Sequence, residues 1–128
     1  MVIQKDQDVV LFRNRVKEYA VKIGMGLVNQ TKLITAASEL VRNMLRYANG
    51  GEVLIEVVSR IRENGIRLTF IDKGPGIADI EKAMQDGYST GKSLGLGLPG
   101  TKRLVNEFNL KSTVGEGTVV TIVKWKNG

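Results

Sequence analysis

The sequence predicts an α+β fold, a two-layer sandwich in which a mixed, mostly antiparallel sheet carries helices on one face. Apolar residues recur at helical spacing in the first part of the chain and alternate at strand spacing in the middle and near the C-terminus. The strands come as neighbouring pairs joined by short glycine-containing turns, which indicates antiparallel hairpins. We therefore expect the order helix, helix, strand, strand, helix, helix, strand, strand in a single domain over residues 1–128.

A short edge strand is expected within Met1–Gln7, before the first helix. That helix should cover Asp8–Ile23, where apolar residues form a stripe at helical spacing. The Gly24–Gly26 segment should end it, because glycine readily adopts the left-handed conformation found after helices. Phe12 and Tyr19 on this helix fit either the core or an interface, and the core is the favoured interpretation.

The next helix has the longest periodic apolar pattern in the chain. Asn29 or Thr31 is its expected N-cap, and Asn49 should follow its last turn. Glu39 and Asn43 lie four residues apart, so their side chains share one face of this helix. A carboxylate can orient or deprotonate a hydroxyl, and an amide oxygen can bind Mg²⁺. Two polar residues on a solvated helix face explain the same pair.

Two central strands are predicted over Val53–Arg60 and Ile66–Asp72, which alternate apolar and polar residues. Asn64–Gly65 is the expected hairpin turn between them. The apolar residues of the second strand should face the core, and Asp72 continues their register. Its carboxylate should therefore point inward, where it needs hydrogen-bond partners.

Gly74 and Gly76 follow this strand on either side of a proline. Such a backbone can turn sharply and lets another molecule approach closely. An inward carboxylate beside bare backbone suits the amino group of an adenine-type base. Capping of the turn by Asp72 explains the same carboxylate.

The C-terminal part is predicted to hold a short helix, a glycine-rich loop, a second helix and a final hairpin. Their expected bounds, in chain order, are Asp79–Asp86, Gly87–Leu98, Pro99–Phe108, Leu110–Val114 and Thr118–Trp125. The hairpin turns around Gly115, and Gly117 opens its second strand. The hydroxyl of Thr118 can join the Asp72 carboxylate at the edge of a base, although Gly-Thr is also ordinary hairpin chemistry.

The glycine-rich loop nearly matches two phosphate-binding motifs. The Walker spacing requires glycine where Asp86 stands, and the dinucleotide motif matched by Gly95–Gly100 lacks a preceding strand. Both motifs depend on one physical feature that this segment also has. A glycine-rich loop leads into a helix N-terminus at Pro99 and offers N–H groups to a phosphate. Lys92 can add positive charge there. A flexible loop before a glycine-assisted helix start accounts for the same pattern.

Composition excludes several classes of function. The chain has no cysteine and no histidine, which excludes disulfides, thiolate metal sites, zinc-hydrolase chemistry and Ser-His catalysis. The net charge is +6, but Lys and Arg are scattered singly and aromatics are few, which favours a solvated surface that suits acidic partners over nucleic-acid binding. No apolar run is long enough to span a membrane and no signal peptide is visible, so we expect a cytoplasmic location.

Four motifs in this order resemble those of the Bergerat ATP-binding fold, shared by gyrase-type ATPases, Hsp90, MutL and the catalytic domains of histidine kinases. They are Ser38–Asn43 (the N box), Asp72–Ile77 (D-x-G-x-G), Gly91–Gly100 (the second glycine box) and Gly117–Thr118. A stand-alone domain of this size resembles the partner-switching kinases of anti-sigma-factor type. The sequences of Ala37–Asn43 and Asp86–Thr90 are similar to those of the RsbT-type switch kinases of the stressosome.

The resemblance implies ATP and Mg²⁺ as cofactors and assigns roles to the motif residues. Glu39 would orient the incoming hydroxyl or act as its general base, and Asn43 would hold Mg²⁺. Asp72 would accept from the adenine amino group with help from Thr118. The glycines after Asp72 would let the base and sugar approach. The residues implied for nucleotide binding besides Asp72 and Thr118 are Gly74, Gly76, Gly91, Lys92, Gly95, Leu96 and Gly97.

The resemblance also implies a function. It predicts a serine/threonine protein kinase that phosphorylates STAS-domain proteins of a stressosome. Once released, the kinase would bind the N-terminal region of a PP2C-type phosphatase and activate it. One alternative is an anti-sigma-factor kinase that sequesters a sigma factor directly, and another is a binding module in which phosphorylation is vestigial. No nucleic-acid or membrane partner is expected.

Overall fold

In a computed structural model of the chain, residues 1–78, 84 and 97–128 are described. The elements in chain order are β1 (Val2–Ile3), α1 (Asp6–Lys22), α2 (Leu27–Ala48), β2 (Gly51–Arg60), β3 (Glu63–Asp72), α4 (Gly97–Leu104), β4 (Glu107–Thr113) and β5 (Gly117–Trp125). The helix predicted over Asp79–Asp86 lies outside the described residues.

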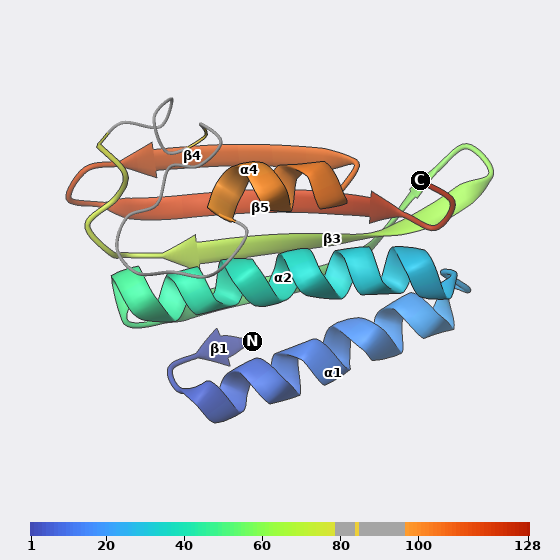
Figure 1. The fold of residues 1–128 in the computed structure, drawn as a ribbon, viewed down its shortest axis with the longest axis horizontal. Coiled ribbons are helices and arrows are strands. Elements are labelled where there is room, and N and C mark those ends of the chain that lie inside the picture. Colours follow the sequence, from blue (N-terminus) through green and yellow to red (C-terminus); the bar gives the residue numbers. More distant parts are fainter. Residues whose placement is uncertain (79–83, 85–96) are drawn as a thin grey trace.

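The predicted α+β class is confirmed. The strands form one five-stranded sheet in the order β1-β2-β3-β5-β4, and every described pair is antiparallel. α1, α2 and α4 lie on the same side of this sheet (Figure 1). β5 is inserted between β3 and β4, so the last strand in the chain is next to the centre of the sheet. The predicted edge strand is confirmed by β1, which pairs with β2.

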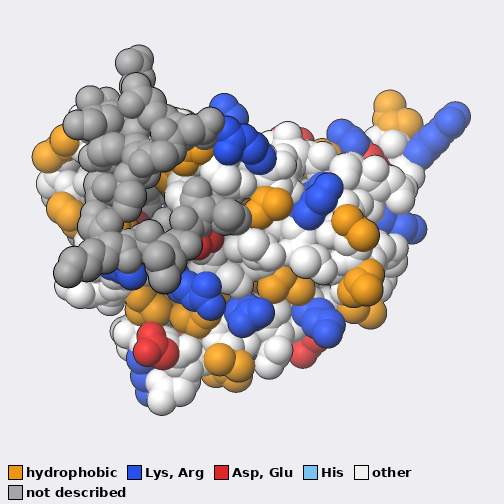
Figure 2. Space-filling model, viewed as in Figure 1, with side chains coloured by type: hydrophobic (Ala, Val, Ile, Leu, Met, Phe, Trp, Pro, Cys, Tyr) orange, Lys and Arg blue, Asp and Glu red, His pale blue; other side chains and the backbone are white. Residues whose placement is uncertain are grey.

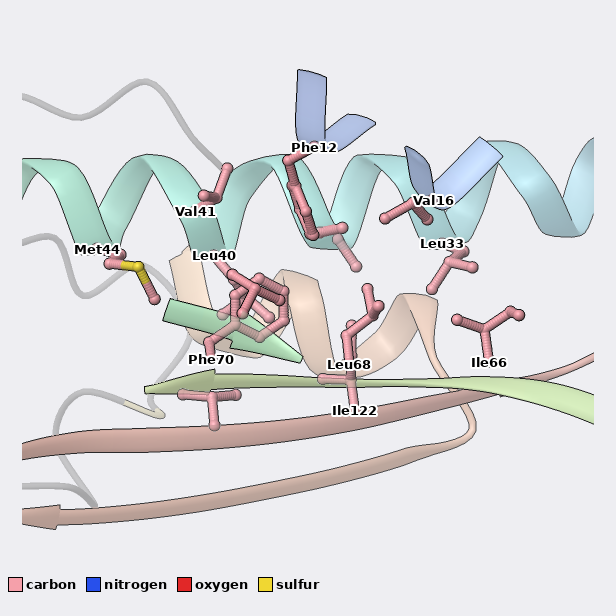
Figure 3. Close-up of a cluster of buried hydrophobic side chains, with 14 of the residues drawn as sticks. Phe12, Val16, Leu33, Leu40, Val41, Met44, Ile66, Leu68, Phe70 and Ile122 are labelled. Carbon is pink, nitrogen blue, oxygen red and sulfur yellow. The ribbon is translucent and has the colours of Figure 1, made fainter. Parts of the chain in front are cut away.

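The core lies between α1, α2 and the sheet (Figure 3). The expected inward face of β3 is confirmed, because Ile66, Leu68 and Phe70 are all buried. Phe12 is also in the core, and its ring meets that of Phe70 edge-on with 5.8 Å between the ring centroids. Burying side chains of this size contributes about 1.5–3 kcal/mol each, so this layer holds the sheet and both long helices together.

α1 begins two residues earlier than predicted. Asp8 accepts hydrogen bonds through Oδ2 from the backbone N–H groups of Gln4 (2.9 Å) and Lys5 (3.1 Å). These bonds draw the chain ahead of Asp8 into the first turn, so the helix starts at Asp6. The expected end is confirmed by Gly24, which follows the helix with φ +82°.

The N-cap predicted for α2 is wrong. The cap is Gly26, one residue before the helix. Asn29 instead donates from Nδ2 to the Lys126 carbonyl (3.1 Å), and the Thr31 hydroxyl donates to a carbonyl one turn earlier (2.9 Å). A tertiary partner and back-bonding within the helix therefore occupy both side chains. The end of the helix is as predicted, with Asn49 in the left-handed conformation (φ +59°).

The turn predicted between β2 and β3 is also wrong. The strands pair as far as Arg60 and Glu63, which leaves a two-residue turn with Arg62 at φ +70°. Asn64 and Gly65 lie inside β3 instead. A Cβ added at Gly65 would lie 2.6 Å from the Trp125 ring. This glycine therefore allows close packing between β3 and β5 and does not form the turn.

α4 also differs from its predicted bounds. It starts two residues before Pro99, which lies in the first turn, and it ends before Phe108, which belongs to β4. Asn106 draws the chain into the sheet, because its N–H donates to the Val123 carbonyl (2.9 Å) and its Oδ1 accepts from the Trp125 N–H (2.8 Å). These tertiary bonds end the helix before its apolar pattern does.

The surface of the helix side carries Lys and Arg side chains spread over several elements rather than gathered into one block (Figure 2). Among the residues that the structure describes, no helix is long and apolar enough to cross a membrane.

Candidate nucleotide-binding site

The structure brings several predicted site residues together at one end of the molecule. There β3 ends, β5 begins and α2 reaches its C-terminus (Figure 1). Asp72 stands opposite Thr118 in the pairing of β3 with β5. A Cβ added at Gly74 would lie 2.6 Å from the Ala48 Cβ, so the loop after β3 lies against the last turn of α2. The D-x-G-x-G motif, the closing Gly-Thr and the end of the N-box helix therefore meet.

The Asp72 carboxylate is half-buried and held by two backbone N–H groups. Its Oδ1 accepts hydrogen bonds from Gly74 (2.9 Å) and from Thr118 (3.2 Å). The prediction that this carboxylate needs hydrogen-bond partners is therefore confirmed, and both the turn and the neighbouring strand supply them. Oδ2 accepts no hydrogen bond from the residues that the structure describes. The side chain is thus oriented through one oxygen and keeps the other as an acceptor.

The two glycines after Asp72 let the loop lie close to its neighbours. Gly74 is against α2, as the Ala48 contact shows. Gly76 has φ +78°, and a Cβ there would lie 2.4 Å from the carbonyl oxygen of Thr113. Glycine is therefore required at both positions by the protein itself. This packing explains the motif without a ligand and also places the loop between α2 and the β4–β5 hairpin.

Ser112 is a site residue that the sequence-based reasoning missed. It lies on β4 opposite Thr118, and their hydroxyl oxygens are 2.8 Å apart. The Ile77 N–H donates to Ser112 Oγ (2.7 Å), and Ser112 Oγ donates to the Gly117 carbonyl (3.2 Å). The available signal was its position in the strand, because Ser112 continues the inward register of Leu110.

Glu39 and Asn43 lie on the half of α2 that leads to this end of the molecule. Glu39 is only 8% exposed and makes no hydrogen bond or ion pair with the described residues. Asn43, one turn later, is half-buried. A fully solvated helix face fits Glu39 poorly, because almost all of this residue is covered by the rest of the chain. Glu39 therefore offers acceptor oxygens that no described residue occupies, from a largely covered position.

Part of the glycine box lies outside the described residues, namely Gly91, Lys92, Gly95 and Leu96. Gly97 is described and is the first residue of α4, with φ +70°. Its carbonyl accepts a hydrogen bond from the hydroxyl of the fully buried Thr101 (3.0 Å). α4 packs against α2, so the helix that the glycine box leads into lies beside the N-box helix (Figure 1).

The described side chains at this site limit how a metal ion could be bound there. Among the described residues, no group of three or more His, Cys, Asp or Glu side chains could hold a metal ion. Asn43 provides a single amide oxygen. Mg²⁺ commonly uses one or two protein ligands and completes its shell with water and phosphate oxygens. The described donor set therefore fits Mg²⁺ brought with a nucleotide better than a metal caged by protein alone.

Comparison with known proteins assigns the class. Residues 28–127 match the family described as histidine kinase-, DNA gyrase B-, and HSP90-like ATPases. The chain belongs to this family, and the Bergerat-type ATPase fold expected from the four motifs is confirmed.

Two curated relatives show which members of this family the chain resembles in sequence. Over 123 residues the chain is 45% identical to the serine/threonine-protein kinase RsbT of Bacillus subtilis, covering 96% of this chain and 92% of the relative. It is 30% identical over 127 residues to an anti-sigma F factor of Caldanaerobacter subterraneus, covering 96% of this chain and 89% of the relative. The expected resemblance to RsbT-type kinases is confirmed. The predicted enzyme class, an ATP-dependent serine/threonine protein kinase, is confirmed by this relative and by the ATPase family.

Solved structures agree in fold. The Acinetobacter baumannii histidine kinase AdeS superposes with a TM-score of 0.55 at 20% identity, covering 77% of this chain and 48% of AdeS. Full-length ShkA in complex with AMPPNP gives a TM-score of 0.59 at 17% identity, covering 96% of this chain and 30% of ShkA. The chain therefore spans about half of AdeS and under a third of ShkA, and the likeness concerns the fold alone.

Proposed function

We propose that the protein is a partner-switching serine/threonine kinase that uses Mg-ATP. The observation that carries the proposal is the Asp72 carboxylate, which is oriented through Oδ1 by Gly74 and Thr118 while Oδ2 accepts no hydrogen bond from the described residues. An acceptor held in this way suits the amino group of adenine, because the fold has already oriented the carboxylate before the ligand arrives. Membership of an ATPase family supports the same ligand.

The remaining nucleotide contacts follow from the motifs. Gly74 and Gly76 shape the loop beside the base and sugar, and Thr118 assists Asp72. Asn43 offers its amide oxygen to Mg²⁺, which when bound neutralises charge on the phosphates. The residues that we propose to contact the phosphates are Gly91, Lys92, Gly95, Leu96 and Gly97.

Glu39 is the proposed catalytic residue. Its side chain is largely buried, makes no hydrogen bond or ion pair with the described residues and precedes Asn43 by one helical turn. Such a group can orient the hydroxyl of a substrate serine or threonine, or accept its proton. Phosphoryl transfer depends mostly on positioning and on charge neutralisation, so a small set of residues suffices.

The proposed substrates are serine or threonine residues of STAS-domain proteins in a stressosome. Once released from them, the kinase binds the N-terminal region of a PP2C-type phosphatase and activates it. This assignment is supported by the 45% identity to a curated serine/threonine-protein kinase RsbT. We place the protein in the cytoplasm, where such partners would meet it.

A second candidate is an anti-sigma-factor kinase that binds a sigma factor directly. It is favoured by the 30% identity to an anti-sigma F factor over almost the whole chain. Retention of the chain by an immobilised sigma factor, compared with retention by the phosphatase regulatory region, separates the two candidates. We expect the phosphatase region to retain the chain.

The test of kinase activity is incubation of the purified chain with Mg-ATP and a STAS-domain partner, followed by identification of the phosphorylated residue. Glu39→Ala should bind ATP normally but transfer phosphate at least about 100-fold more slowly. Glu18→Ala, which removes an exposed carboxylate on α1, serves as the matched control and should remain fully active. Normal phosphorylation by Glu39→Ala would show that its assigned role is wrong.

A further inference from the structure

Three hydrogen-bond contacts converge on the hydroxyl of Ser112, which belongs to none of the four motifs. Its Oγ lies 2.7 Å from the Ile77 nitrogen, 3.2 Å from the Gly117 carbonyl oxygen and 2.8 Å from Thr118 Oγ1. The side chain is partly buried and faces the same side of the sheet as Thr118, its partner in the strand register. The direction of these three bonds determines what the Thr118 hydroxyl can offer to a ligand.

The directions follow from counting hydrogens and lone pairs. A serine hydroxyl has one hydrogen and accepts through two lone pairs. The Ile77 N–H can only donate, so it occupies one lone pair, and the Gly117 carbonyl can only accept, so it takes the hydrogen. The second lone pair remains for Thr118, whose hydroxyl must then be the donor in the 2.8 Å contact. All three contacts are satisfied together only in this arrangement.

Thr118 therefore has no hydrogen left for a ligand, and its oxygen can only accept. Asp72, directly across the strand pair, also presents an acceptor in Oδ2. Two neighbouring acceptors suit a group with two hydrogens to give, such as the 6-amino group of a purine or a water molecule attached to it. The same pair repels the 6-oxo oxygen of hypoxanthine or guanine.

We infer that Ser112 is a positioning residue that keeps the Thr118 hydroxyl an acceptor and so makes the site selective for 6-amino over 6-oxo purine nucleotides. The inference rests on the nucleotide site proposed above. Without the Ser112 hydroxyl, the Thr118 hydrogen is released and can rotate towards a 6-oxo oxygen. Discrimination by Thr118 then falls, while discrimination by the Asp72 carboxylate remains.

The experiment measures dissociation constants for Mg-ATP and Mg-ITP by calorimetry. The two nucleotides share the ribose and phosphates and differ only in the purine, where ITP carries a 6-oxo group. In Ser112→Ala, the ratio of the ITP constant to the ATP constant should fall about three- to tenfold, the range expected for one hydrogen bond. Ser112→Thr keeps the hydroxyl and should retain the ratio. Thr113→Ala removes an exposed hydroxyl from the neighbouring position and is the control.

The outcomes distinguish failure of the Ser112 inference from failure of the proposed nucleotide-binding function. If Ser112→Ala weakens ATP and ITP equally, Ser112 has only a structural role and the inference is wrong. If Ser112→Ala does not fold, Ser112→Cys keeps a side chain of the same shape, slightly larger and with only a weak donor and acceptor, and must show the reduced ratio instead. Failure of the unmodified chain to bind Mg-ATP would overturn the proposed function, and selectivity through Ser112 with it.

Discussion

The Asp72 carboxylate and the Thr118 backbone N–H are joined across two strands, with 3.2 Å between Oδ1 and the nitrogen. The two residues are 46 positions apart in the chain and face each other because β5 lies beside β3 in the sheet. The strand pairing that builds the sheet therefore also orients the carboxylate that we propose to accept from adenine. Changes on either strand should be felt in nucleotide binding.

Asp72→Asn should abolish most nucleotide binding without unfolding the chain. The amide oxygen of Asn can still accept from Gly74 and Thr118, which keeps the loop in place. The other oxygen becomes an NH₂ donor that faces the adenine amino group, so ATP affinity should fall at least about tenfold. Calorimetric titration measures this loss, with Glu116→Gln in the exposed hairpin turn as the control. Unchanged affinity in Asp72→Asn would remove this residue from the site.

Gly76→Ala should lower the free energy of unfolding by roughly 2–4 kcal/mol, because it combines a left-handed backbone with a clash. Its φ is +78° and the added Cβ would lie 2.4 Å from the Thr113 carbonyl oxygen. Gly115→Ala is the matched control, since φ is +81° there but nothing lies within 4 Å of the added Cβ. It should cost only about 1–2 kcal/mol. Equal losses in urea unfolding would contradict the packing assigned to Gly76.

Asn43→Ala should raise the Mg²⁺ concentration needed for ATP binding. Asn43 is the only described N-box side chain to which we assign the metal, so its loss should shift the midpoint of a Mg²⁺ titration by roughly tenfold, equivalent to about 1.4 kcal/mol. Asn43→Asp keeps an oxygen ligand and should preserve the midpoint. The assignment is wrong if Asn43→Ala and Asn14→Ala, an exposed control on α1, have the same midpoint.

Lys124 should make stability depend on alkaline pH. It is buried on the core side of β5, and burial lowers its pKa, with a smaller contribution from the charge of Lys32. An unfolded lysine has a pKa of about 10.4, so between the folded and unfolded values the folded chain binds fewer protons. Stability contributed by Lys124 therefore rises with pH in this window and is lost as pH falls through the folded value.

The measurement compares the unmodified chain with Lys124→Met in urea unfolding from about pH 8 to about pH 10, a window below the usual lysine value. The free energy of unfolding of the unmodified chain should rise relative to that of Lys124→Met over this range. The variant also loses the hydrogen bond from Nζ to the Gly128 carbonyl (2.8 Å), which shifts its curve but not the slope. Parallel curves would show that Lys124 does not titrate in this window.

Local patterns predicted much of the fold. The α+β class, the inward face of β3 and the core position of Phe12 depend on periodicity within single elements, which is visible in the sequence. The features that were missed depend on tertiary partners. Asn29 does not cap its helix because the Lys126 carbonyl takes its side chain, and Gly65 is a packing glycine only because Trp125 lies beside it.

The candidate site divides in the same way. Asp72 was identifiable because its own strand orients it and because its motif is contiguous. Ser112 was not, since its importance depends on which strand lies next to β4 and on the loop that reaches it from Ile77. The roles assigned to Glu39 and Asn43 remain predictions, although the burial of Glu39 fits them.

The placement of β5 between β3 and β4 has a consequence for how the protein is made. β4 emerges from the ribosome first but has no neighbour in the sheet until β5 follows. Asp72 likewise lacks the hydrogen bond from the Thr118 N–H until β5 has been made. A growing chain should thus bind no nucleotide until β5 has been inserted beside β3, and from then on ATP would favour the paired sheet by mass action. Bound nucleotide would then stabilise only those chains in which β5 has paired with β3.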